Sequence, residues 1–268
     1  MKKLMLFLVS SLLFFSGAAA NSQYAYLTDF KTNLTIQADT TELVKPSVAV
    51  ARGQLPSGDA RHYKMIFSDR VKGFETLKIS PKAKVTLLTF PSLAPKATSL
   101  ENLRLMLSGD EALPSEFERS YIFKYTQTGK IVTSIAQVNT RAVTGVFEQA
   151  VLISKKSNIS ARKFVLDFVN IYTTSREMQR AGQTMDDNPG GMSISNTNPL
   201  LRTFSLAKSG RIKLLKTVGE YFNATLAQLE AGLNGQTLGY FFSWETHFYA
   251  TISDVTNEML ELKQGYEP

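Results

Sequence analysis

The chain has 268 residues, 30 of them Lys or Arg and 23 Asp or Glu, which gives a net charge of +7 and an isoelectric point near 9.4. The absence of cysteine excludes disulfides, thiolate nucleophiles and zinc knuckles, and two histidines disfavour His-rich metal sites and His-based triads. We therefore expect no metal and no cofactor. The basic excess would attract RNA, DNA or anionic lipid without choosing among them, and it also suits a soluble protein with positive charge spread around its surface.

The first stretch, MKKLMLFLVSSLLFFSGAAANS, has the pattern of an export signal. Two lysines precede an apolar run, and small residues stand at Ala18 and Ala20 before the expected cleavage. We expect residues 1–20 to be removed and the chain from Asn21 to be periplasmic or secreted. No later stretch has the 18 or so apolar residues of a membrane-spanning helix, so no membrane span is expected in the mature chain.

In the first half, apolar runs of strand length follow one another. They alternate or run continuously over 47–52, 62–67, 75–80, 84–90 and 130–138. The region between the last two is predicted to be a loop with one short helix around 99–107. The first half is therefore expected to form a mixed sheet.

The second half favours helices. Apolar residues recur at helical spacing over 161–181 and again over 211–233, and the polar stretch 186–199 between them is typical of a loop. The end of the chain, from 239, is predicted to be an aromatic strand or hairpin and a short last helix. Strands followed by helices indicate an α+β fold, and with no internal repeat or linker visible we expect residues 21–268 to form a single domain.

Several short pieces then stand in a particular order. HYKMIF holds Tyr63 with an aromatic residue four positions on, LSGD covers 107–110, and SYIFKYTQTG holds Tyr121 with a glycine eight positions on. REMQR holds Glu177 and Arg180 in the predicted helix 161–181, and KSGRIKLL holds Ser209. In this order they resemble the ribosome-inactivating protein family, the RNA N-glycosidases that include ricin A chains and Shiga toxin A subunits.

The resemblance implies an exported toxin that removes an adenine from a ribosomal RNA loop. Arg180 would then be the cation at the purine, and Glu177 would stabilise the ribosyl cation and orient the attacking water. Tyr63 and Tyr121 would stack on the base, and Ser209 stands where the family places an active-site tryptophan. The partner would be the ribosome, and the chain would act alone or with a separately encoded, non-covalent cell-binding subunit.

Other interpretations stay open. Glu177 and Arg180 also suit a solvated ion pair, Arg176 could take the place of Arg180, and either tyrosine suits a half-buried strand position. A second hypothesis is a non-enzymatic exported binding protein that uses its basic surface and the aromatic stretch GYFFSWETHFY, although such stretches are also typical of a core. A third is a catalytically inactive member of the toxin fold.

Overall fold

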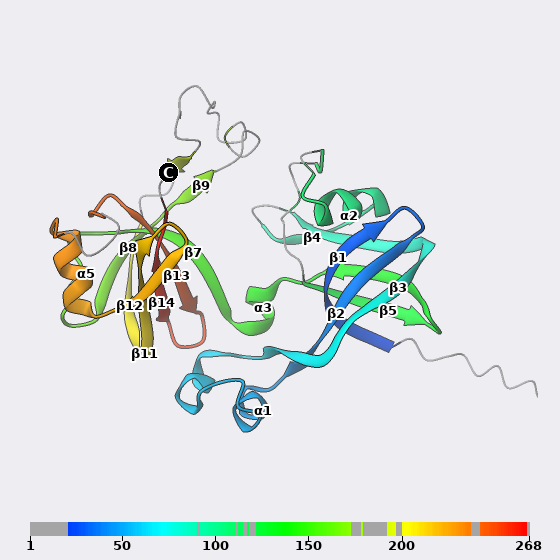
Figure 1. Ribbon diagram of the computed structural model, residues 1–268, viewed down its shortest axis with the longest axis horizontal. Coiled ribbons are helices and arrows are strands. Elements are labelled where there is room, and N and C mark those ends of the chain that lie inside the picture. The colour runs from blue at the N-terminus through cyan, green and yellow to red at the C-terminus, as the bar shows by residue number, and fades with distance from the viewer. Residues whose placement is uncertain are drawn as a thin grey trace, which may run out of the picture.

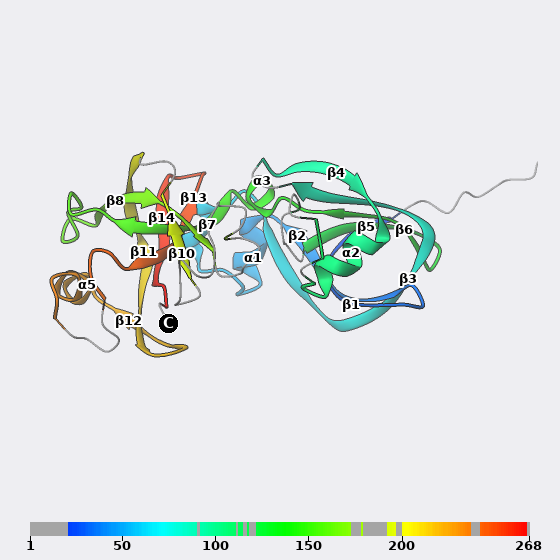
Figure 2. The ribbon, with the colours of Figure 1, turned by 90° about the horizontal axis from the view of Figure 1, so that it is seen from above.

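The computed structural model describes residues 21–89, 92–110, 112–114, 117, 122–172, 178, 192–196, 200–236 and 242–266, and it is mostly β. Figures 1 and 2 show two groups of strands side by side, with α1 between them.

The first group comprises β1 (Asn21–Lys31), β2 (Thr35–Val44), α1 (Pro46–Ala51), the 3-10 helix η1 (Ser57–His62), β3 (Ile66–Thr89), β4 (Ala94–Thr98), α2 (Leu100–Leu107), β5 (Ile122–Thr128) and β6 (Ile131–Gln137). After α3 (Thr140–Thr144), the second comprises β7 (Val146–Ile153), β8 (Lys163–Phe168), β9 (Asn170–Tyr172), β10 (Ser193–Ser195), β11 (Leu201–Thr217), β12 (Glu220–Ala224), α5 (Leu226–Leu233), β13 (His247–Ser253) and β14 (Glu258–Gln264).

The strands of the first group close into a barrel. Strands β1, β2 and β3 form an antiparallel meander, β5 and β6 form a hairpin that pairs with β1, and β6 lies parallel to β3. Because β3 pairs with both β2 and β6, the sheet returns to its first strand, and β4 is added outside as a hairpin partner of β3. This is the connectivity of the Greek-key barrels known as OB-folds.

The second group repeats this connectivity. Strands β7, β8 and β11 form the meander, β13 and β14 form the hairpin, and the parallel pair is β11 with β14. Strand β12 follows β11 as β4 follows β3, and α5 precedes the hairpin as α2 does. The chain therefore contains the same barrel twice, although no repeat is apparent in its sequence; the expectation of no internal repeat was wrong at the level of structure.

The two parallel pairings share one register at an offset of 127 residues. Val85 pairs with Ile135 and Ile212 pairs with Leu262. Both ladders are interrupted by a bulge, between Ile79 and Lys84 in β3 and between Leu206 and Arg211 in β11. An equal offset on both sides of an equal bulge means that residues can be matched one to one between the barrels in this region.

A buried glutamine occupies the same place in each barrel. The side-chain oxygen of Gln137 accepts a hydrogen bond from the backbone N–H of Leu88 at 2.6 Å, and that of Gln264 accepts one from the N–H of Leu215 at 3.0 Å. Both pairs are 49 residues apart. Each glutamine thus satisfies a buried backbone donor where β3 or β11 continues past the barrel towards its added strand.

The first hairpin connection differs in length between the barrels, residues 32–34 against 154–162, but it ends in the same way in both. Leu34 and Arg162 both have a φ of +59°, a backbone conformation that L residues rarely adopt. The carbonyl oxygen of Leu34 accepts a hydrogen bond from the backbone N–H of Ile79 at 2.8 Å, and that of Arg162 accepts one from the N–H of Leu206 at 2.9 Å. Both donors lie just before the bulge. This hydrogen bond ties the turn to the bulged strand in both barrels.

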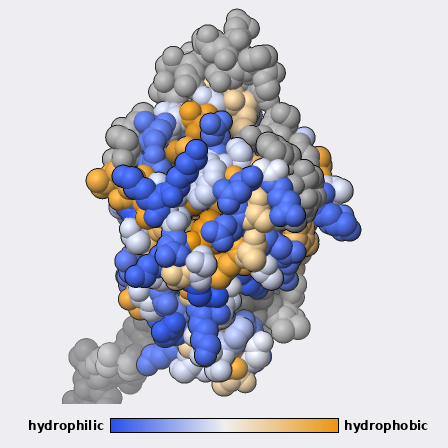
Figure 3. All heavy atoms as spheres, turned by 90° about the vertical axis from the view of Figure 1, so that its left-hand side faces the viewer, coloured by the Kyte–Doolittle hydropathy of each residue, from blue (hydrophilic) through white to orange (hydrophobic). Residues whose placement is uncertain are grey.

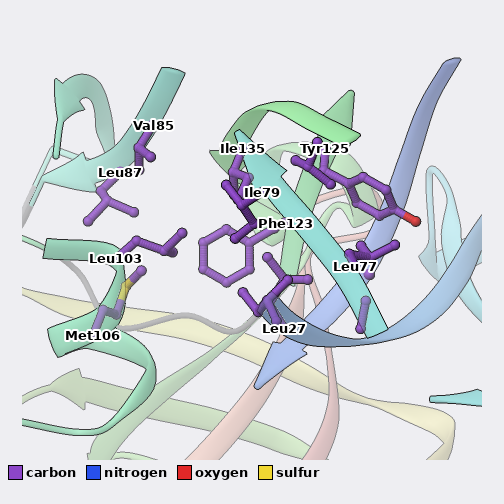
Figure 4. Close-up of a cluster of buried hydrophobic side chains, with 14 of the residues drawn as sticks. Leu27, Leu77, Ile79, Val85, Leu87, Leu103, Met106, Phe123, Tyr125 and Ile135 are labelled. Atoms are coloured by element: carbon purple, nitrogen blue, oxygen red, sulfur yellow. The ribbon is translucent and has the colours of Figure 1, made fainter. Parts of the chain in front are cut away.

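A short capped helix packs onto each barrel core. Ser99 and Thr225 are the N-caps of α2 and α5, and each side-chain oxygen accepts from a backbone N–H three residues on. Both helices have Leu at their first, fourth and eighth positions. In Figure 4, Leu103 and Met106 of α2 lie beside Phe123 inside the first barrel. A separate cluster around Phe248, with Leu229 and Leu233 of α5, fills the second barrel.

The α+β prediction was wrong, because the described part of the expected helical half is mostly strands; within the helix predicted over 211–233, only Leu226–Leu233 is helical, as α5. Residues 163–168 and 170–172 are β8 and β9, where Phe164 and Leu166 alternate into the core. Residues 211–224 lie in β11, β12 and their turn, and Val218, placed on the apolar side of the predicted helix, is 63% exposed. Short apolar runs fit both a helical and a strand period, and in these segments pairing with neighbouring strands of the barrel favours the strand.

Smaller predictions had mixed outcomes. The strands within 75–80, 84–90 and 130–138 and the helix at 99–107 are confirmed. The strand at 47–52 is instead the helix α1, which begins with a proline, and the predicted last helix is β14. In the described part of the chain no helix is long and apolar enough to cross a membrane. The signal 1–20 lies outside the described residues, and a single folding unit over 21–268 stays a prediction.

We predict that Gln264→Leu and Gln137→Leu each lower the free energy of unfolding by about 1–3 kcal/mol, because each leaves a buried backbone N–H without its acceptor. Urea unfolding followed by circular dichroism measures the loss. Gln37→Leu, at a half-buried position of β2 where the side-chain amide makes a solvent-exposed hydrogen bond to Thr76, is the matched control and is expected to cost less than about 0.5 kcal/mol. Equal losses in all three variants would contradict the structural role of the two glutamines.

Candidate functional site

Four of the six predicted site residues, Tyr121, Arg176, Glu177 and Arg180, lie outside the described residues. The long helix expected to carry the Glu-x-x-Arg pair does not extend over 163–172, which are strands. Met178 is helical and fully buried. Whether Glu177 and Arg180 form a catalytic pair or a surface ion pair therefore stays a prediction.

The other two, Tyr63 and Ser209, meet at the junction between the barrels. Tyr63 directly follows η1, which belongs to the long connection between β2 and β3, and Ser209 lies in the bulge of β11. Asp59 of η1 accepts a hydrogen bond from the Ser209 hydroxyl. The same Asp59 is close enough to Tyr63 to influence its ionisation. The structure thus brings these two predicted residues together, at a contact between η1 and the outer face of the second barrel.

A buried serine fastens this contact. The hydroxyl of Ser253, at the end of β13, donates to the carbonyl oxygen of His62 at 2.6 Å and accepts from the backbone N–H groups of Val255 and Thr256 at 3.1 and 3.3 Å. The His62 ring is fully buried, and its Nδ1 lies 2.8 Å from the Thr256 hydroxyl. These bonds join η1 to the turn between β13 and β14.

Two ion pairs surround the serine. Arg61 lies 3.0 Å from a carboxylate oxygen of Glu258 at the start of β14. Arg141, in α3 between the barrels, donates two hydrogen bonds to Asp254 at 2.7 and 2.9 Å. A bidentate arginine pair is geometrically specific, so it helps to fix how the linker meets the second barrel.

Tyr63 stands in a mixed electrostatic environment. Burial raises the pKa of its hydroxyl above the ordinary 10.0, and the negative charges of Asp59 and Glu261 raise it further, while Arg211 lowers it. Arg211 and Lys213 in turn lie 3.2 and 3.0 Å from Glu261. A tyrosine whose pKa lies above 10.0 stays protonated at neutral pH, which suits packing better than acid–base chemistry.

The aromatic stretch near the end of the chain belongs mainly to the core. Phe242 and Phe248 are buried in the second cluster and contact each other edge to face, with Trp244 packed beside them. Tyr240 and Phe241 lie outside the described residues. On the side of the second barrel seen in Figure 3, hydrophilic side chains predominate and apolar ones are scattered among them. The binding surface proposed for this stretch is thus used for packing where it is described.

The first barrel has a counterpart of the face that η1 contacts. At the 127-residue offset, Lys82 corresponds to Ser209 and Lys84 to Arg211. Lys82 lies in the bulge of β3 and Lys84 directly after it, and both are exposed, as are Lys78 before the bulge and Lys130 in the β5–β6 turn. Ile131 is 43% exposed although it is aliphatic. We call Lys78, Lys82, Lys84, Lys130 and Ile131 the lysine face.

The two equivalent faces differ in charge. In the second barrel, the six corresponding positions carry one positive and two negative charges: Ser205, Ser209, Arg211, Asn257, Glu258 and Glu261. Lys208 in the bulge and Lys213 beside Glu261 add two positive charges, so this face is mixed, with a net +1. In the first barrel the six positions carry four positive charges and no negative one, a net +4: Lys78, Lys82, Lys84, Lys130, Ile131 and Ser134. Within the described part of the chain, no ion pair neutralises any of these four lysines.

The comparisons with known proteins assign the chain to no family, because no family model, curated protein or solved structure matches it. As for metals, the described residues contain no cluster of three or more His, Asp or Glu side chains with the geometry to hold an ion.

The lysine face and the repeat behind it were not predicted, although two weak signals are present in the sequence. KVTLL at 84–88 and RIKLL at 211–215 share a basic–aliphatic–x–Leu–Leu pattern. SLENLRLMLSG at 99–109 and TLAQLEAGLNG at 225–235 share a hydroxyl N-cap, three leucines and a glycine two residues after the helix. Their spacings are nearly equal, and a search for pairs at equal spacing would have found the repeat.

We predict that Ser253→Ala lowers the free energy of unfolding by about 1–3 kcal/mol, because the His62 carbonyl and two backbone N–H groups lose their partner in a buried site. Urea denaturation gives the value. Ser205→Ala, on an exposed position of β11, removes the same hydroxyl and is expected to change it by less than about 0.5 kcal/mol. A loss no greater than that of Ser205→Ala would contradict the fastening role of Ser253.

We also predict that Tyr63 ionises above pH 10 and that Asp59→Asn lowers its pKa, because the substitution removes a negative charge. An ultraviolet difference titration of each protein against its Tyr63→Phe variant isolates this tyrosine. Since the pKa is raised in the folded state, the corresponding stability is complete below the unfolded pKa and is lost as the pH rises through the folded one. A pKa in Asp59→Asn equal to or above that of the unmodified protein would contradict the assignment.

Proposed function

We propose that the protein is an exported, non-enzymatic binding protein and that the lysine face of the first barrel holds an anionic partner. The observation that supports this most is the difference between the equivalent faces. Where the second barrel has a face of mixed charge in contact with η1, the first has a face of four lysines, net +4, that is exposed. The interiors are alike and the outer faces differ, so the outer face is where the barrels have taken different roles.

The physical basis is electrostatic. Four lysines on neighbouring positions repel one another, and within the described residues no carboxylate lies at ion-pair distance from any of them. An anionic partner relieves it and gains attraction that salt weakens, since exposed charges are screened over about 8–10 Å at physiological ionic strength. Ile131, which pairs with Lys78 and is 43% exposed, adds apolar surface among the lysines. Basic groups beside exposed apolar side chains are typical of a binding surface.

The N-glycosidase hypothesis remains a prediction beside this proposal. The residues that would carry its chemistry, Glu177 and Arg180, lie outside the described part, and the strands over 163–172 leave less helix than the resemblance requires. The export signal, on which both hypotheses depend, stays a prediction as well.

We predict that Lys82→Glu with Lys84→Glu weakens binding of an anionic probe, heparin or a poly-glutamate peptide, by about tenfold or more, which corresponds to about 1.4 kcal/mol. Isothermal titration calorimetry at low and physiological salt measures this. The control is Lys155→Glu with Lys156→Glu in the β7–β8 turn, which makes the same charge change on the other barrel. An equal loss in the control would show that net charge, rather than the lysine face, governs binding.

We predict that the purified chain from Asn21 releases no adenine from bacterial or eukaryotic ribosomes, because binding through the lysine face requires no catalytic groups. Free adenine is measured by chromatography beside the Glu177→Ala, Arg180→Ala double variant. Release that disappears in the double variant would contradict the proposal and establish the N-glycosidase.

A further inference from the structure

We infer that the anionic partner is an acidic protein segment that docks against the bulge of β3 as η1 docks against the bulge of β11. This inference rests on the proposed function and names the partner of the same face. The contact of η1 with the bulge of β11 shows what kind of ligand this barrel surface accepts.

The η1 contact defines three positions on the second barrel. Asp59 reaches Ser209 in the bulge, Arg61 reaches Glu258 at the start of β14, and Tyr63 lies near Arg211 and Glu261. Two of these residues belong to η1 and Tyr63 directly follows it, so all three contacts come from the five residues 59–63. A short segment of polypeptide is therefore enough to engage this surface.

The corresponding positions of the first barrel favour a segment of different sequence. Lys82 replaces Ser209, so the first position of a ligand would carry a carboxylate, as Asp59 does. Ile131 replaces Glu258, so the second would be apolar where Arg61 is basic. Ser134 replaces Glu261 and leaves Lys84 without a carboxylate nearby, so the third would be acidic. The preferred segment thus reads acidic, apolar, acidic at alternate positions.

The same residues favour polypeptide over nucleic acid. Proteins that bind single-stranded nucleic acid without sequence preference stack bases on aromatic rings along a basic groove. On the lysine face the side chain between the lysines is Ile131, which offers no stacking surface but suits an apolar side chain. Lysines attract phosphate and carboxylate alike, so the discrimination comes from the isoleucine and from the bulge geometry already used to hold a peptide.

The test uses a peptide built on the chain's own docking segment. Residues 55–66 are synthesised with Arg61→Leu and Tyr63→Glu, beside the unmodified peptide. Binding to the chain from Asn21 is measured by fluorescence anisotropy, with heparin and a single-stranded DNA as further probes. We expect the modified peptide to bind about fivefold or more tightly than the unmodified one, since exposed ion pairs contribute modestly and more than one is formed.

A face-swapped protein supplies the decisive comparison. Lys82→Ser, Ile131→Glu and Ser134→Glu together give the first barrel the residues of the second, all at positions that are not buried, and thermal unfolding checks that the variant is folded. The swap should abolish the preference for the modified peptide, whereas Lys155→Glu with Lys156→Glu should keep it. A preference that survives the swap would overturn the inference.

The outcomes separate the two proposals. If heparin or DNA binds in a way that depends on Lys82 and Lys84 but neither peptide does, the acidic segment is wrong and the proposed function stands. If no anionic probe binds, the proposed function falls and the inference falls with it.

Discussion

The parallel pairing that closes each barrel is the constraint on which the rest of the structure depends. Strand β3 must run beside both β2 and β6, and β11 beside both β8 and β14, so each is long, bulged and bent. A strand that bends away from a closed barrel exposes a backbone donor to the interior, and Gln137 and Gln264 accept from these donors. The bulge needed for closure also creates the outer surface that Ser209 and Lys82 occupy.

The two barrels agree inside and differ outside. Matching residues such as Val85 and Ile212, or Phe123 and Phe248, fill equivalent places in separate cores, because close packing tolerates little change of volume. Outer positions carry no such restriction. The second barrel uses its bulge to hold η1 and so fixes the two barrels together, while the first presents lysines on the matching surface. One architecture therefore supplies an internal contact and, in our account, an external one.

Sequence reasoning succeeded where local signals decide the structure. The apolar run 84–90 gave a strand, and the short helix expected around 99–107 is α2. It failed where the run was short and apolar, as at Phe164 to Val169, since two periods fit and only the closing pairings choose. The contact of Asp59 with Ser209, 150 residues apart, depends on how two barrels meet. The lysine face was hidden because spacing alone does not show which lysines point outward around a bulge.

The measurement that tests the central claim most directly is the rate at which each lysine is acetylated, followed by mass spectrometry, with and without the modified 55–66 peptide. The account predicts that Lys78, Lys82, Lys84 and Lys130 react readily in the free protein and are protected together by the peptide, while Lys155, Lys156 and Lys163 are unchanged. Protection spread evenly over all lysines, or confined to the second barrel, would contradict the claim that the first barrel's open face is the binding surface.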